Sequence, residues 1–131
     1  MNLRHLETLL AIAEREARDL ATVPVRNPGI GFGPAGFVRI FTRWYQHTGR
    51  EIFLEASRQS LRDLLALRQP GKGIGGFVTV DRSGRERGLD PSFLSGASGI
   101  GLVLLAAVSP VEPLWDRLLL LSPPVIHSRT S

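Results

Sequence analysis

Histidines, which commonly bind metal ions and transfer protons near neutral pH, are few and widely separated in this sequence. His5, His47 and His127 are its three histidines, and they fall in different parts of the chain. The absence of cysteine excludes disulfides, thiolate metal sites and a cysteine nucleophile. Neither an HExxH pattern nor a compact cluster of His, Asp and Glu is present. We therefore expect no metal site, no other cofactor and no identifiable catalytic residue, with the histidines exposed or capping helices.

A glycine-rich run around Lys72, QPGKGIGGF, invites comparison with a phosphate-binding loop. Such a loop needs a hydrophobic strand before it and a GK[ST] sequence that opens a helix after it, and this sequence has neither. We interpret residues 69–90 as a connecting loop, with a brief strand at Phe77 to Val80 and a turn at residues 81–84.

The net charge of +4 comes almost entirely from arginine, since Lys72 is the only lysine. The arginines are spread along the chain among Asp and Glu, without a basic run interleaved with aromatic residues. We expect no nucleic-acid partner. No signal peptide is recognisable, and the longest apolar run is too short to span a bilayer. We expect a cytoplasmic protein that has no membrane partner.

That apolar run, Ile100 to Val108, has no polar side chain. A helix that is apolar on every face is normally buried in a larger helical assembly. We therefore expect an inner helix here, covered by the rest of the chain. We expect the short apolar segment Leu118 to Leu121 to be covered as well.

Three further helices are predicted by spacing and by capping residues. The first covers residues 3–20, with Asn2 as N-cap and a Glu14–Arg18 pair on its polar face. The second covers residues 35–47 and stops at Gly49, and the third covers residues 51–68. The apolar stripe of the first helix has spacings of three and four: Leu3, Leu6, Leu10, Ala13, Ala17 and Leu20. In the second helix, Phe37, Ile40, Phe41 and Trp44 form the apolar face, and we place Arg39 and Arg43 elsewhere.

The helix at residues 35–47 and the apolar helix that contains Ile100 to Val108 open with the same short pattern, 63 positions apart. Asn27-Pro28 is followed by Gly33-x-x-Gly36, and Asp90-Pro91 is followed at the same spacing by Gly96-x-x-Gly99. Glycine allows the start of an inner helix to pass close to its neighbours. We interpret the pattern as an internal repeat of two helical units.

The segments QPGKGIGGF and DPSFLSGASGIGLVLLAAVSPVEPLWDRLLLLS resemble the C-terminal end of the lanthionine synthetase C-like (LanC-like) cyclases. Members of that family typically close with an FLxGxxG elbow, a very apolar final helix and a WDRxLLLS-type ending. The upstream segment GFGPAGFVRIFTRWYQHTGREIFLEASRQSLRDLLALRQ is similar to the preceding unit of the family. The resemblance covers nearly all of this chain and about the last third of a typical member.

The resemblance implies an all-α fold, a partial α/α toroid of about two units of paired inner and outer helices. Family members hold a zinc ion with two cysteines and a histidine. The zinc activates a peptide cysteine thiolate for addition to dehydroalanine or dehydrobutyrine, which forms a thioether ring. Two of these ligand positions fall on Gly31 and Phe32, which cannot bind zinc. The other ligand and the acid–base residues belong to units upstream of the matched region.

Residues 1–131 are expected to form one domain, with a flexible tail at residues 122–131. Two units cannot close a ring, and an open apolar edge promotes association. We therefore expect the chain to bind copies of itself or another protein that completes the toroid.

Three functions are compatible with these observations. The first is an accessory module without zinc that binds a precursor peptide or a protein during lanthipeptide-type modification. The second is one part of a split or metal-independent lanthionine cyclase, and the third is a purely structural helical oligomer. In the first case the elbow residues would line the binding surface: Gly31, Phe32, Gly33, Gly36, Phe93, Gly96 and Gly99. Simple helix-entry geometry is the alternative explanation for the same residues.

Overall fold

The computed structural model describes residues 2–20, 26–31, 33–81 and 83–119. Its helices are α1 (Leu3–Asp19), α2 (Pro34–Thr48), α3 (Glu51–Ala66) and α4 (Ala97–Val108), followed by a 3-10 helix, η2 (Leu114–Leu119). These ranges contain isolated β-bridges but no strand. The all-α prediction is confirmed, whereas the toroid stays a prediction. No helix in the described part of the chain is both long and apolar enough to cross a bilayer.

Helix α1 begins as predicted but packs over only part of its length. Asn2 Oδ1 accepts a hydrogen bond from the backbone N–H of Arg4 at 3.1 Å, and Arg18 pairs with Glu14 at 3.5 Å. Both predictions are confirmed. The apolar stripe is covered only toward its C-terminal end, because Leu3 is 73% and Leu6 51% exposed. The expectation that the whole stripe packs inward is therefore wrong.

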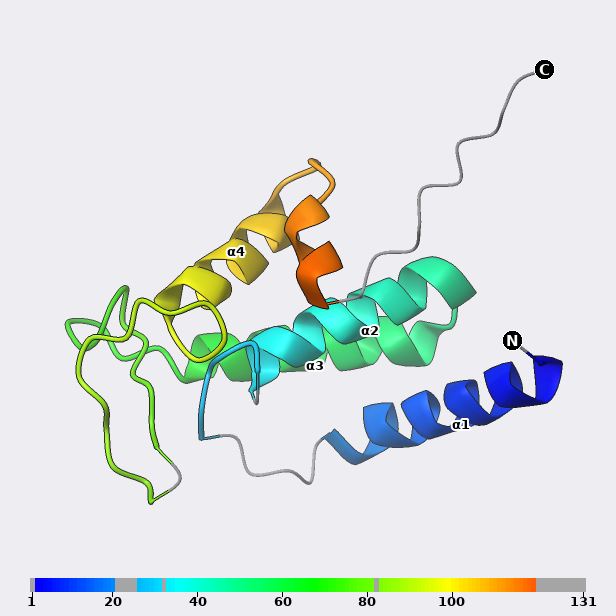
Figure 1. The fold of residues 1–131 in the computed structure, drawn as a ribbon, viewed down its shortest axis with the longest axis horizontal. Helices are drawn as coiled ribbons and strands as arrows, with labels where there is room; N and C mark the ends of the chain where they lie inside the picture. The colour runs from blue at the N-terminus through cyan, green and yellow to red at the C-terminus, as the bar shows by residue number, and fades with distance from the viewer. Residues whose placement is uncertain (1, 21–25, 32, 82, 120–131) are drawn as a thin grey trace.

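Helices α2 and α3 form an antiparallel hairpin at the centre of the molecule (Figure 1). The predicted stop at Gly49 is confirmed: its φ of 66° is left-handed, and its N–H donates to the Tyr45 carbonyl at 2.8 Å. Stacked rings fill the space between the helices. The ring centroid of Phe53 in α3 lies 6.2 Å from that of Phe41 and 5.5 Å from that of Trp44. The helix boundaries differ from the predicted ones by only one or two residues.

The connection between α3 and α4 contains no strand in its described residues. The only β pairings there are isolated bridges, Ile74 with Phe77 and Val80 with Glu86, so the strand predicted at Phe77 to Val80 is wrong. Left-handed glycines at 71, 73, 75 and 76 coil the chain too tightly for an extended segment to pair along its length. The predicted turn after it is confirmed, since the Gly84 N–H donates to the Asp81 carbonyl at 3.0 Å.

Helix α4 packs against α2 on one face, opposite the side of the hairpin that carries α1 (Figure 1). Its buried residues are Gly99, Ile100 and Val103. Leu105 is 60% and Val108 82% exposed, so the prediction of a helix covered on all sides is wrong. Besides α2, the core cluster that holds Ile100 and Val103 includes Leu64 of α3, with Trp115 and Leu119 of η2 packed against it, so the cover within the described residues lies on that side of α4.

The segment after α4 is also less covered than expected. Residues 114–119 form η2, in which Leu118 is 80% exposed. The expectation that this apolar segment is covered is therefore wrong for Leu118. Leu120, Leu121 and the predicted tail at 122–131 lie outside the described residues.

Candidate functional site

The two glycine elbows have the same backbone design. In the first, Asn27 Oδ1 accepts a hydrogen bond from the Gly29 N–H at 3.0 Å. In the second, Asp90 Oδ1 accepts one from the Ser92 N–H at 2.9 Å. Each turn leads to an extended glycine that caps the following helix, Gly33 for α2 and Gly96 for α4. The sequence repeat thus corresponds to a repeat in the structure.

Close backbone contacts explain the glycines of both elbows. A Cβ atom placed on Gly36 would lie 2.1 Å from the Ile30 carbonyl oxygen, and one on Gly99 would lie 2.0 Å from that of Phe93. These distances are far shorter than van der Waals contact. A side chain at either position would force the elbow away from the helix that it opens.

The elbows also contact each other. The Gly31 N–H donates to the Leu94 carbonyl at 2.8 Å. A Cβ atom on Gly29 would lie 2.8 Å from that same oxygen, so the two backbones pass very close together. The α2 and α4 entrances therefore form one unit.

The loop between α3 and α4 stabilises the paired elbows, because it makes one hydrogen bond to each of them. Asn27 Nδ2 donates to the Val80 carbonyl at 3.1 Å, and Thr79 Oγ1 donates to the Ser95 carbonyl at 3.0 Å. The Asp90 carboxylate accepts hydrogen bonds from residues of its own elbow. Hydrogen bonds from the side chain and backbone of Ser92, with one from the Ser95 hydroxyl, lower the pKa of Asp90 from 3.8 to about 2.

The seven predicted surface residues differ in accessibility. Four of them are buried glycines that serve helix entry: Gly33, Gly36, Gly96 and Gly99. Gly31 is exposed, and Phe93 is half-buried with its ring edge-on to Trp115 at 6.1 Å. Phe32 lies outside the described residues. Binding of a peptide by these residues stays a prediction.

The residues at the family's zinc position do not fit a zinc ion. Gly31 has no side chain, and the nearest backbone to it is the Leu94 carbonyl of the other elbow. His5 and His47 are exposed on different helices, and His127 lies outside the described residues. Within the described ranges no group of three His, Asp or Glu side chains could hold a metal ion. We therefore derive no chemical step through zinc for this chain.

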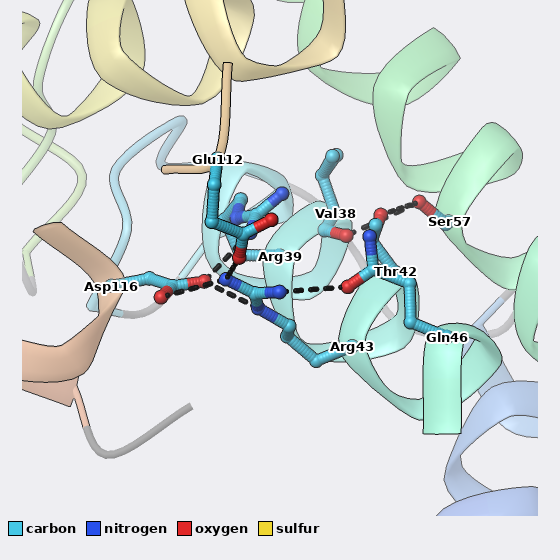
Figure 2. Close-up of polar contacts among 8 residues, drawn as sticks. All are labelled: Val38, Arg39, Thr42, Arg43, Gln46, Ser57, Glu112 and Asp116. Carbon is cyan, nitrogen blue, oxygen red and sulfur yellow. Dashed lines mark hydrogen bonds and ion pairs between the residues drawn. The ribbon is translucent and has the colours of Figure 1, made fainter. Parts of the chain in front are cut away.

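A buried ionic cluster joins α2 to η2 (Figure 2). Asp116 is fully buried and accepts hydrogen bonds from Arg39 Nη2 at 2.6 Å and from Arg43 Nε at 2.7 Å. Arg43 Nη2 also binds Glu112 Oε1 at 2.6 Å. The Arg39 guanidinium lies over the Trp115 ring, 5.7 Å from its centroid. The cluster fixes the chain after α4 against α2.

Among the described residues, this cluster pairs positive groups with negative ones. Two guanidinium groups face two carboxylates, and the hydrogen bond to Asp116 raises the pKa of Arg43 against the opposing effect of burial. The Asp116 carboxylate is enclosed and bound by both arginines, which makes it a structural counter-ion and not an accessible base.

Sequence reasoning missed this cluster. Arg39 and Arg43 were expected away from the apolar face, yet they are 4% and 7% exposed. Two arginines four positions apart on an apolar helix, together with the Asp of the WDR sequence, are the signal that could have revealed it. In the described structure Arg39 Nε is buried without a hydrogen-bond partner.

Comparison with protein-family models, curated proteins and solved structures finds no match for this chain. The LanC-like resemblance therefore stays a prediction.

The repeat shows which surface of α4 is uncovered. In α2, the residues that face α3 are Val38, Phe41 and Thr42: the Val38 carbonyl accepts from Ser57 Oγ at 3.2 Å, Phe41 stacks on Phe53, and Thr42 Oγ1 lies 2.7 Å from Ser57 Oγ. The equivalent residues of α4 are Gly101, Leu104 and Leu105. Gly101 and Leu105 are exposed and Leu104 is only partly buried. No helix in the described ranges takes the place beside α4 that α3 takes beside α2.

A pocket adjoins this uncovered face. It has a volume of about 470 Å³ and lies between the C-terminal end of α3, the glycine loop and α4. Its lining is Leu65, Arg68, Ile74, Gly75, Phe77, Ala97, Ile100, Gly101 and Leu104. Arg68 is the single charged residue of this lining, and its Nε donates to the Gly75 carbonyl at 3.0 Å. The surface is suited to an apolar helix or peptide that carries an acidic group near the rim.

Proposed function

We propose that this protein is a binding and assembly module that receives an amphipathic helix or peptide on α4. The observation that carries the proposal is the contrast between Thr42, which is hydrogen-bonded to α3, and its repeat equivalent Leu105, which is 60% exposed. A leucine in such a position gains stabilisation from burial when a partner covers it. The adjoining pocket extends the same apolar surface.

The process that this module serves is proposed from the resemblance to LanC-like cyclases. We propose an accessory role in lanthipeptide-type peptide modification, in which the chain holds a precursor peptide or completes the toroid of a synthetase. The repeated arrangement supports the proposal of a partial α/α toroid, because each glycine elbow opens a helix and α3 packs along the first of these two helices. The chain's own residues contribute binding and not thiolate activation, since Gly31 stands at one ligand position.

Fluorescence polarisation with a labelled full-length lanthipeptide precursor tests this role. We expect saturable binding that Leu105→Glu weakens by at least about tenfold, because a carboxylate would be buried in an apolar contact. Leu89→Glu is the matched control, since Leu89 is 74% exposed and lies in the loop before the second elbow. Binding that is absent, or equally strong in both variants, would refute a peptide-binding role for α4.

A further inference from the structure

The chain has a second uncovered apolar surface, on α1. Leu3, Leu6, Leu9 and Ile12 are 73%, 51%, 45% and 53% exposed. The remainder of the same helix is used in the fold, because Leu10, Ala13 and Ala17 pack against the cluster that contains Phe41 and Phe53. Helix α1 is thus an amphipathic helix whose N-terminal half lacks a partner among the described residues.

The contacts of α3 define where a helix that covers α4 would lie. Helix α3 contacts both α2, which it covers, and α1, which lies beside it. Transferred by one repeat, the missing helix would cover α4 and lie beside α3. The pocket lined by Leu65 of α3, by Arg68 just after α3, and by Gly101 and Leu104 of α4 is at that place. By the repeat, a helix there would also lie over Leu105, which is one turn beyond Gly101 and lines a separate pocket with Val111 and Leu114.

We propose that this place is occupied by the N-terminal half of α1 from a second copy of the chain. The inference rests on the proposed function, because it assigns the partner of the same α4 surface. Leu3 and Leu6 would enter the apolar groove, and Glu7 of the same helix half would face Arg68 at the rim. A single interface would then cover the exposed α4 surface of one copy and the exposed half of α1 of the other.

This association is head-to-tail, since a different surface of each copy takes part. In one chain α1 and α4 lie on opposite sides of the α2–α3 hairpin (Figure 1), so both can be engaged at once. Each added copy leaves one α1 and one α4 uncovered at the ends of the assembly. Growth ends in a ring where the rotation between copies closes, and gives an open filament where it does not.

Light scattering coupled to size exclusion, on the 131-residue chain without peptide, tests the inference. The variants are Leu6→Glu on α1 and Leu105→Glu on α4, and Leu89→Glu is the control. All three leucines are at least 51% exposed, so folding is retained and circular dichroism can verify it. We expect the wild type and Leu89→Glu to assemble as concentration rises, and each of the other variants to assemble at least about tenfold more weakly.

A mixture of Leu6→Glu and Leu105→Glu tests most directly whether α1 of one copy binds α4 of another. Leu6→Glu retains an intact α4 surface, and Leu105→Glu retains an intact α1 surface. An equimolar mixture can therefore form one wild-type interface and no second one. We expect a heterodimer that contains one copy of each variant and does not grow further.

Several outcomes would overturn the inference. A wild-type chain that stays monomeric at every concentration would do so. Assembly of Leu6→Glu as strong as that of the wild type would exclude α1 as the occupant, although precursor binding could still support a role for α4. Assembly of Leu105→Glu at wild-type strength would exclude α4 from self-association. A mixture that stays monomeric would show that the two surfaces do not bind each other.

Discussion

Asp116 Oδ2 lies 2.6 Å from Arg39 Nη2, although the two residues are 77 positions apart in the sequence. Asp116 also binds Arg43, and both arginines are buried with it. Removal of the carboxylate would take the shared counter-ion from the buried guanidinium groups of Arg39 and Arg43, and Glu112, which also pairs with Arg43, is 59% exposed. The cluster therefore determines where the chain after α4 is held.

Replacement of Asp116 is expected to destabilise the fold strongly. We expect Asp116→Asn to lower the free energy of unfolding by about 3–5 kcal/mol, the usual cost of breaking a buried ion pair on one side. Urea denaturation followed by circular dichroism measures it. Glu55→Gln is the control, because its pair with Arg58 is exposed on both sides and should contribute less than about 1 kcal/mol. Equal effects of the two variants would show that the buried cluster adds little stability.

Alanine is expected to have opposite effects at the elbow glycines and at Gly101, which lies in the interior of α4. Gly36→Ala and Gly99→Ala should each destabilise the protein by about 1–3 kcal/mol, because the new Cβ would overlap a carbonyl oxygen. Gly101→Ala should stabilise the monomer by about 0.5–1 kcal/mol, since a Cβ there meets no atom within 4 Å and alanine favours a helix interior. Thermal unfolding at low protein concentration compares them. A stabilising Gly99→Ala would contradict the close approach at the second elbow.

Asp90 predicts a pH-dependent contribution of the second elbow. Its pKa is about 2 in the fold and 3.8 when unperturbed, so folding favours the ionised form. The resulting stability is present above about pH 4 and disappears as the pH falls through about 2. Asp90→Asn copies the amide of Asn27 in the first elbow and removes only the charge. We expect the difference in unfolding free energy between wild type and Asp90→Asn to shrink between about pH 4 and pH 2, and a difference that is constant over that range would contradict the assignment.

Substitutions of Gly49, in the turn between α2 and α3, are expected to lower stability by different amounts. Its left-handed φ of 66° disfavours a side chain even though a Cβ there meets no atom within 4 Å. Gly49→Ala should cost about 1 kcal/mol of stability, and Gly49→Asn should cost less, because asparagine tolerates this conformation. Chemical denaturation of both variants measures the order. Equal costs would indicate that the backbone conformation is not the cause.

Local features of the sequence predicted local features of the structure well. Asn2 caps α1, Gly49 ends α2, and the two Asx-Pro-glycine elbows open α2 and α4 at equivalent positions. These outcomes depend on a few adjacent residues and on the backbone conformations that those residues allow. A pattern such as Gly33-x-x-Gly36 carries its own steric explanation wherever the chain places it.

The strand predicted at Phe77 to Val80 is absent because a short extended segment needs a pairing partner that the local sequence does not show. Val78 and Thr79 are buried, but the described residues provide no long extended partner, and positive-φ glycines precede them. A strand needs a second segment in register, which lies beyond local sequence. The same reasoning explains the burial of Arg39 and Arg43, whose counter-charge is supplied by a distant segment.

By itself, the sequence determined the helical class, the helix boundaries, the glycine elbows and the lack of zinc ligands at Gly31 and Phe32. Propensity, capping and side-chain chemistry act over a few residues, so they can be read without a fold. Only the tertiary structure decided that Asp116 neutralises Arg39 and Arg43, and that α4 is covered on one face while Leu105 faces solvent. Burial and ion pairing depend on which distant segments meet, and an apolar run such as Ile100 to Val108 shows a need for cover without showing what provides it.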